Sequence, residues 1–265
     1  GCSHKCLYCY ATYYIGSIDS RPKRNFIRML KKDLSKADPR IPVVLSSSSD
    51  PYPPEEGRYA LTRRSLDILQ KYGFKVLIMT KSDMVLRDVD IIRRGKICVS
   101  ITITTLDKVL AKTIEPNAPS PDKRLNAVKE LASKGVNVIT RIDPIIPFLN
   151  DDPHELRELV GLLVEQGVKH IVTSTYKLRP DSYRRLSTAF PEYSNRWKQL
   201  YMVNGMRIGS YMYLARSLRE KMLRPVVREA RRLGVTYATC REGLTSKEYF
   251  NSPTCDGTHL LEVYR

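Results

Sequence analysis

Long hydrophobic runs are missing from this chain of 265 residues. No apolar stretch approaches the roughly 18 residues that a membrane-spanning helix needs, and no secretory signal is visible after Gly1. We therefore expect a cytoplasmic protein without a membrane partner. Tryptophan occurs once and phenylalanine five times, against 16 tyrosines, yet hydrophobic residues still make up 42% of the chain. That share excludes a disordered or collagen-like chain and suffices for a folded core.

Acidic residues are scarce compared with basic ones. The chain has 28 Asp and Glu against 45 Lys and Arg, which gives a net charge of +17. A surface of this charge attracts polyanions. It favours a nucleic acid, RNA or DNA, as the partner, and the alternative is a solvated basic surface on a protein with a small substrate. We expect a monomer.

Short apolar runs alternate with amphipathic segments that end in glycine, a pattern typical of a parallel α/β fold. The strands are almost continuously apolar, which predicts that both faces of the sheet are covered. We expect strands at about 41–45, 74–79, 97–103, 136–142 and 168–173, with a further strand before Gly1. We expect helices at about 22–35, 58–72, 85–94, 121–134 and 153–166. The rhythm stops near Tyr176, so a partial barrel or open sheet is expected over residues 1–175 and a basic extension over 176–265, with a long helix around 214–233 that breaks at Pro225.

Polar residues gather where each predicted strand ends. They lie at 46–50, 81–83, 102–105, 141–143 and 173–176. The carboxyl ends of parallel strands meet at one edge, which is where active sites of this fold class lie. We therefore expect these segments to share one site.

Cysteine is uncommon, and three of the six cysteines fall within eight positions. Cys2, Cys6 and Cys9 form a C-x3-C-x2-C run, in which one loop can wrap one metal centre. Three thiolates cannot fill a four-iron cluster, so one iron would remain open to a small molecule. The alternative is a zinc site of three cysteines and a histidine, such as His4.

The cysteine run resembles the cluster loop of the radical S-adenosylmethionine (SAM) enzymes, with Tyr8 before its last cysteine. Several further segments resemble the spore photoproduct lyase-related, DNA repair photolyase-like branch of that family: residues 1–11, Ser46 to Pro51, Thr80-Lys81, Cys240-Arg241-Glu242 and Cys255-Asp256-Gly257. The resemblance implies a partial (β/α)6 barrel with a mainly helical C-terminal extension. It also implies a [4Fe–4S] cluster on Cys2, Cys6 and Cys9, and an external electron donor such as ferredoxin or flavodoxin.

In that family the open iron chelates SAM, and one electron from the cluster splits the sulfonium to a 5′-deoxyadenosyl radical. By motif position, the resemblance assigns the cofactor-binding residues Tyr8, Ser49, Lys81, Ser100 and Arg141. Tyr8 would lie near the adenine, Ser49 would hydrogen-bond SAM, and Lys81 would pair with its carboxylate. Ser100 would reach the ribose or amino-acid part, and Arg141 could contact the carboxylate. The alternative for Lys81 and Arg141 is a solvated charge at a strand end.

The remaining cysteines have more than one interpretation. Cys98 lies in an apolar run and is expected as a small buried hydrophobe. Cys240 and Cys255 are candidate catalytic thiols, as a redox pair, ligands of a second centre or a hydrogen donor; the alternative is two unlinked thiols. Tyr8 and Tyr10 resemble the radical-relay tyrosines of spore photoproduct lyase, whose hydrogen-donating cysteine is matched here by Ser47. We therefore expect a reaction different from that of the lyase.

The region after residue 175 interleaves cations with aromatic residues, which suits stacked or flipped bases. The alternative is a set of amphipathic helices with their aromatic residues in the core. The sequence thus predicts a radical SAM enzyme that acts on a nucleic acid, by base modification or lesion repair. Two alternatives stay open: radical chemistry on a small molecule or peptide, and a non-catalytic metal-containing protein that binds nucleic acid.

Overall fold

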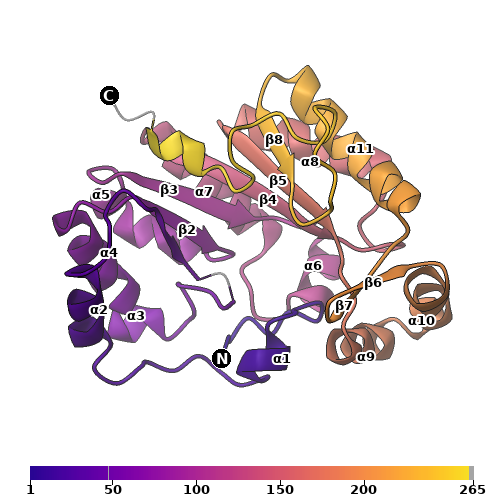
Figure 1. Cartoon of the computed structure of the whole chain (residues 1–265), viewed down its shortest axis with the longest axis horizontal. Helices are drawn as coiled ribbons and strands as arrows, with labels where there is room; N and C mark the ends of the chain where they lie inside the picture. The colour runs from indigo at the N-terminus through magenta and orange to yellow at the C-terminus, as the bar shows by residue number, and fades with distance from the viewer. Residues whose placement is uncertain (47, 263–265) are drawn as a thin grey trace.

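The computed structural model of the chain describes residues 1–46 and 48–262. Within these residues, six parallel strands form one open sheet in the order β1-β2-β3-β4-β5-β8 (Figure 1). The strands are β1 Val43–Leu45, β2 Val76–Thr80, β3 Ile97–Thr102, β4 Asn137–Ile145, β5 His170–Thr175 and β8 Thr236–Thr239. The open, six-stranded α/β arrangement confirms the predicted partial barrel.

Helices connect the strands and pack on one face of the sheet. They are α2 Phe26–Leu34, α3 Glu56–Tyr59, α4 Leu61–Lys71, η1 Asp83–Asp88, α5 Val89–Ile92, α6 Lys108–Ile114, α7 Pro121–Ser133, α8 Pro153–Glu165 and α11 Arg216–Arg232. The short helix α1 Thr12–Ile15 follows the cysteine run. Between β5 and α11 lie α9 Pro180–Ala189, α10 Pro191–Lys198, the π-helical turn η2 Gln199–Val203 and the hairpin β6 Met206–Ile208 and β7 Tyr211–Tyr213. No helix within 1–46 and 48–262 is long and apolar enough to cross a membrane.

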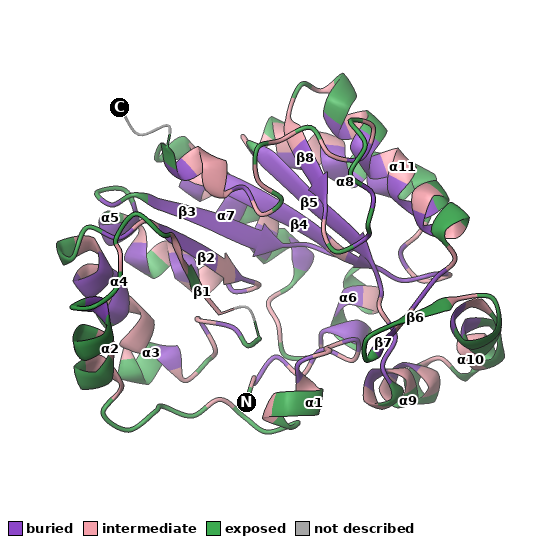
Figure 2. Ribbon diagram, viewed as in Figure 1, coloured by how far each residue is buried: buried purple, intermediate pink, exposed green. Residues whose placement is uncertain are grey.

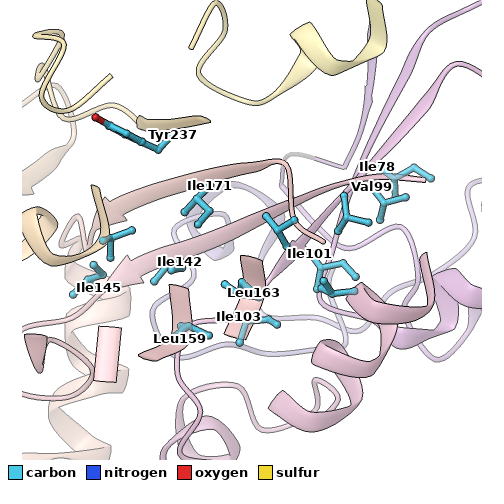
Figure 3. Close-up of a cluster of buried hydrophobic side chains, with 14 of the residues drawn as sticks. Ile78, Val99, Ile101, Ile103, Ile142, Ile145, Leu159, Leu163, Ile171 and Tyr237 are labelled. Atoms are coloured by element: carbon cyan, nitrogen blue, oxygen red, sulfur yellow. The ribbon is translucent and has the colours of Figure 1, made fainter. Parts of the chain in front are cut away.

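Both faces of the sheet are buried, as the apolar strands predict, because neighbouring residues of a strand point to opposite sides. On the helical side, Ile78, Val99 and Ile171 belong to one buried cluster with Leu159 and Leu163 of α8 (Figure 3). The other, concave side holds a smaller cluster, which consists of Leu77, Cys98, Ile139, Val172 and Leu261. Leu261 comes from the terminal 3-10 helix η3 Thr258–Glu262, which lies across this face (Figure 1). Figure 2 shows the central strands buried and the outer helix surfaces exposed. The part of the concave side near the carboxyl ends of the strands is left for polar residues.

The local sequence explains where the best-predicted helices begin. The Ser120 hydroxyl accepts a hydrogen bond from the amide of Lys123, and the Asp152 carboxylate accepts from the amides of His154 and Glu155. Each cap is followed by a proline at the first helical position, where a missing N–H costs nothing. Both helices therefore begin at the predicted residue.

Several expectations about helices and strands differ from the structure. The helix expected at 85–94 is the 3-10 helix η1 followed by the short helix α5. The helix expected over 58–72 is two helices, because Ala60 has a left-handed backbone and the Glu56 carboxylate accepts the amides of Thr62 and Arg63 at the start of α4. The break expected at Pro225 is absent from α11, which continues because its buried face packs on α8, β5 and β8. The strand–helix rhythm does not end near Tyr176, since β8 pairs with β5 as a sixth strand. The division of the chain at residue 175 stays a prediction.

Candidate active site

A cavity of about 370 Å³ opens at the carboxyl edge of the parallel sheet. Residues from the cysteine run, the ends of the five strands β1 to β5 and the C-terminal region line it. Nine of the predicted site residues lie on its wall: Cys2, Cys6, Tyr8, Cys9, Tyr10, Ser49, Lys81, Arg141 and Cys240. Two others, Ser100 and Cys255, do not line it. The polar strand ends thus meet at one edge, as their positions in the sequence predict.

The cysteine run is an irregular loop that backbone hydrogen bonds fix to the rest of the molecule. The amide of Leu7 donates to the carbonyl of Ile114 at the end of α6 over 2.8 Å. Arg185 of α9 donates from Nε to the Leu7 carbonyl over 3.0 Å and from Nη2 to the Cys9 carbonyl over 2.8 Å. The loop is therefore held from two sides before any metal binds. Nothing in the sequence points to Arg185, because its partners lie more than 170 positions away.

Burial sets the charge state of two thiols of the cysteine run, those of Cys2 and Cys6. Burial raises the pKa of the Cys6 thiol to about 12, although the charge of Lys81 acts in the opposite direction. Burial also raises the pKa of Cys2. Buried thiols are protonated at neutral pH and become thiolates when a metal cation replaces the proton. The donor set therefore fits a thiolate-bound metal centre.

The alternative of a single zinc ion fits less well. Within residues 1–46 and 48–262, no three Cys, His, Asp or Glu side chains stand close enough to hold one metal ion. His4 is buried, and its Nδ1 lies 3.4 Å from the Asp50 carboxylate. An iron–sulfur cluster is wider than one ion, so its thiolates stand farther apart than the four ligands of a zinc ion with bonds of about 2.3 Å.

Asp50 joins the ends of β1 and β2 and was not predicted as a site residue. Its carboxylate accepts the Tyr52 amide (2.9 Å), the Thr80 hydroxyl (2.7 Å) and the Lys81 amide (2.8 Å). Burial alone would raise the Asp50 pKa, but His4 and these donors hold it below its usual value. The carboxylate thereby fixes the backbone of Lys81. In the sequence, the position of Asp50 after a strand and before Pro51 indicates only a turn.

Lys81 directs a charge into the cavity. Its ammonium lies 5.6 Å from the centre of the Tyr8 ring and makes no ion pair with any carboxylate that the structure describes. Burial would lower the Lys81 pKa, but the charges of Cys6 and Glu115 outweigh that effect and raise it. Lys81 is half-buried, and an ammonium at the cavity wall without a bonded counter-ion is a suitable partner for the carboxylate of a ligand.

Tyr8 is held by a buried polar network. Its hydroxyl donates to Glu115, which also accepts the Thr104 hydroxyl (3.2 Å) and pairs with Arg124 (2.5 Å). Glu115 and Arg124 are 1% and 2% exposed. The Tyr8 ring is therefore fixed by its hydroxyl, and one side of it remains at the cavity wall.

Arg141, Ser49 and Ser100 are the three predicted cofactor-binding residues whose surroundings differ from a simple contact with SAM. The Arg141 guanidinium binds Asp143 over 2.6 Å, and Asp143 also accepts the Ser174 hydroxyl. A ligand carboxylate at Arg141 would share it with Asp143. Ser49 is exposed at the rim, where its hydroxyl lies 3.0 Å from that of Ser46. Ser100 points to the concave face, and its buried hydroxyl has no hydrogen-bond partner among the described residues.

The other cysteines separate into two groups. Cys98 is fully buried in the concave apolar cluster, as expected of a small hydrophobe. Cys240 lies on the cavity wall, where its thiol interacts with Arg141. Burial raises the pKa of the Cys255 thiol, and the neighbouring Cys240 raises it further. All cysteines are free thiols. Ser47, which matches the hydrogen-donating cysteine of the lyase, lies outside the described residues.

Aromatic residues after residue 175 divide between the core and the rim. Tyr176, Trp197 and Tyr201 are at most 2% exposed, which confirms the core interpretation for these three. Tyr211 and Arg241 instead line the cavity together with Tyr10. The Tyr10 ring contacts the edge of Tyr211, with ring centres 6.3 Å apart. The region that follows β5 thus contributes one wall of the cavity.

Comparisons with known proteins agree with this geometry. Residues 1–175 match the sequence profile of the Radical SAM superfamily. The Methanocaldococcus jannaschii protein MJ0683 is 34% identical over 214 residues, which are 73% of this chain and 80% of that protein. The Radical SAM Nalpha-GlyT isomerase of Pseudomonas phage M6 is 23% identical over 253 residues, which are 91% of this chain and about half, 52%, of the phage protein.

A solved structure has the same fold. A mutant of spore photoproduct lyase with bound AdoMet and dinucleoside spore photoproduct superposes with a TM-score of 0.69 at 19% identity, over 94% of this chain and 74% of that one. The match of the superfamily profile covers well over half of the chain. This chain belongs to the radical SAM superfamily, whose members use a [4Fe–4S] cluster and S-adenosylmethionine.

Proposed function

We propose that this protein is a radical SAM enzyme that modifies or repairs a base of a nucleic acid. The observation that carries the proposal is the single cavity into which three thiols and an unpaired ammonium face. In the proposal, Cys2, Cys6 and Cys9 are the protein ligands of the cluster. Together the bound cluster and SAM supply reductive cleavage of the sulfonium and a 5′-deoxyadenosyl radical.

The protein's own part is to bind, orient and exclude water. Lys81 pairs with the SAM carboxylate, because Asp50 fixes its backbone and its ammonium has no carboxylate partner in the described chain. Tyr8 lies against the nucleoside part of SAM, because Glu115 fixes the Tyr8 ring at the cavity wall. Ser49 and Arg141 are secondary contacts, because one is exposed and the other shares Asp143. Ser100 offers a free hydroxyl beneath the cavity for a group that reaches the sheet.

The opposite wall bears the residues that would meet the substrate. Cys240 contributes an S–H bond, which is weak enough to give a hydrogen atom to a carbon radical. Tyr10 stands between the cluster loop and Tyr211 and is suited to a radical relay along that wall. Cys255 lies near enough to Cys240 for the charge of Cys240 to raise its pKa, but it is absent from the wall, so we assign it a supporting role rather than contact with the substrate.

Nucleic acid is favoured as the substrate class by charge. A net charge of +17 attracts polyanions. One similar protein supports this class: a structure of spore photoproduct lyase holds a dinucleoside spore photoproduct. The free thiols suit a reducing compartment such as the cytoplasm, with a ferredoxin or flavodoxin as electron donor.

The test starts with protein reconstituted anaerobically with iron and sulfide. It is incubated with SAM, a reductant and, separately, cellular RNA or DNA, and the nucleosides are then examined by mass spectrometry. We expect 5′-deoxyadenosine together with a nucleoside of altered mass. Formation of 5′-deoxyadenosine with unchanged nucleosides would favour a small molecule or peptide. Reconstituted protein that binds nucleic acid without cleaving SAM would favour the non-catalytic alternative.

A further inference from the structure

A group of aromatic and basic side chains lies beside the cavity and takes no part in the cofactor site. We call it the aromatic rim and define it as Tyr13, Tyr14, Arg179, Tyr211 and Arg241. These residues come from α1, the start of α9, β7 and the end of β8. Figure 1 shows α1, α9 and β7 close together beneath the sheet. Tyr211 and Arg241 also line the cavity, so the rim is continuous with it.

Arg179 is an unusual arginine because it is buried without a counter-ion. Arg179 is 2% exposed and makes no ion pair with any described carboxylate. Nη1 donates only to two hydroxyls, those of Ser210 (3.0 Å) and Tyr14 (3.3 Å), and Nε has no hydrogen-bond partner. Buried charges are normally paired, because desolvation is costly. Here the rings of Tyr13, Tyr14 and Tyr211 surround the guanidinium and stabilise its charge by cation–π contacts.

Tyr13 provides a flat surface above this cation. The guanidinium carbon of Arg179 lies 3.8 Å from the centre of the Tyr13 ring. Tyr13 is nevertheless 64% exposed. Its ring packs edge to face with the ring of Tyr14, which is 55% exposed. Large aromatic side chains with this exposure are available to stack with a planar ligand, and the underlying cation fixes the ring.

Arg241 gives the rim a second unpaired cation. Its guanidinium carbon lies 4.8 Å from the centre of the Tyr211 ring, and it makes no ion pair with a carboxylate in the described chain. Its backbone has φ +58°, a left-handed conformation that is costly for a residue with a side chain. The fold thus holds Arg241 at the cavity mouth in a backbone conformation that residues with a side chain disfavour.

We propose that the aromatic rim binds single-stranded nucleic acid, with the exposed Arg241 on the phosphate next to the reacting nucleotide and Tyr13, which Arg179 supports from below, stacked on a neighbouring base. This inference rests on the proposed function and names the surface that the substrate uses. The exposed cation of Arg241, which has no carboxylate partner in the described chain, matches a phosphate, and the exposed Tyr13 ring on the buried Arg179 matches a base. The nucleotide between them would then be directed into the cavity.

The test measures binding of a fluorescein-labelled, single-stranded 20-nucleotide oligonucleotide of mixed sequence to the reconstituted protein by fluorescence anisotropy. The variants are Tyr13→Ala and Arg241→Gln, both at exposed positions, with thermal unfolding as the check that they fold. The matched controls are Tyr72→Ala and Arg93→Gln, which are exposed at the opposite edge of the sheet, where β2 and β3 begin.

We expect Tyr13→Ala to weaken binding about tenfold with an unchanged salt dependence, because it removes stacking. Arg241→Gln should weaken binding and lower the slope of log affinity against log salt by about 0.7, the effect of one lost phosphate contact on a single strand. The controls should bind like the wild type.

Three outcomes would overturn the inference, and they differ in what they imply for the proposed function. If the wild type binds and both rim variants bind equally well with the same salt slope, the rim is wrong and the proposed function stands. If the wild type binds no oligonucleotide at low salt, the nucleic-acid part of the proposed function fails together with the rim. Inorganic phosphate that competes with the oligonucleotide at equal concentration would show an anion site without nucleic-acid preference, which also contradicts the inference.

Discussion

Removing the charge of Arg124 should destabilise the protein far more than removing an exposed ion-pair partner. Arg124 is 2% exposed and donates to the carbonyls of Thr102 (3.1 Å) and Pro119 (2.8 Å) in addition to its ion pair with Glu115. Loss of one partner from a buried pair leaves a buried, uncompensated charge and costs about 3–5 kcal/mol. We therefore expect Arg124→Met to lower the free energy of unfolding by about 4 kcal/mol.

The magnitude follows from what remains around Glu115. In Arg124→Met, the carboxylate still accepts the hydroxyls of Tyr8 and Thr104, so part of its charge stays solvated by the protein. The variant Glu115→Gln keeps the shape and removes the other charge. Residues in direct contact couple by about 0.5–3 kcal/mol, and for a pair at 2.5 Å we expect a coupling of about 2 kcal/mol.

The assay is urea unfolding followed by far-ultraviolet circular dichroism, in reducing buffer on cluster-free protein, because loss of iron would complicate the transition. The matched control is Asp67→Asn, which breaks the exposed pair of Asp67 with Lys71 on α4 and should cost less than about 1 kcal/mol. Effects of Arg124→Met and Glu115→Gln that add within about 0.5 kcal/mol would refute the network, because independent sites add to that accuracy.

Three further predictions concern the cofactor, the partner and pH. Lys81→Gln should weaken SAM binding by tenfold or more, because a hydrogen bond to a charged group is worth about 1.5–3 kcal/mol; equilibrium dialysis with wild-type affinity in the variant would contradict this. Affinity for nucleic acid should fall by about 10³ between 50 and 200 mM salt if some six phosphates are contacted, and an affinity independent of salt would favour a small substrate. Burial lowers the pKa of His170 to about 4 in the folded state, so the unfolded chain binds the proton first as pH falls. Stability should therefore fall as pH decreases from about 6.5 to about 4, and His170→Gln should flatten that part of the urea-midpoint profile; an equal slope in both proteins would refute it.

The sequence predicts the position of the site because two of its signals are local. A C-x3-C-x2-C run and polar residues after apolar strands are each visible within a few positions, and the parallel fold brings the strand ends together. Ser49, Lys81 and Arg141 therefore reach the cavity that the cysteines line. Helices that begin with Ser120 or Asp152 before a proline are predicted for the same local reason.

The parts that the sequence does not reveal depend on distant contacts. Tyr8 and Glu115 are 107 positions apart, and Arg185 and Leu7 are 178 apart, so no spacing rule finds either pair. Tertiary packing also continues α11 through Pro225, against the local preference of proline. The short β8 has no apolar run of its own and becomes a strand because β5 offers it an edge.

The central claim is that Cys2, Cys6 and Cys9 hold one cluster at which SAM is cleaved. The most direct test replaces each of them by serine and replaces Cys98, which is buried in the concave apolar cluster, by alanine as the control. Each protein is reconstituted anaerobically, and 5′-deoxyadenosine is quantified by mass spectrometry after addition of SAM and reductant. Because alkoxide is a poor substitute for thiolate at iron, we expect each serine variant to lose both the thiolate-to-iron absorption and the product, while Cys98→Ala retains them. A Cys6→Ser variant that keeps a full cluster and still forms 5′-deoxyadenosine would contradict the account.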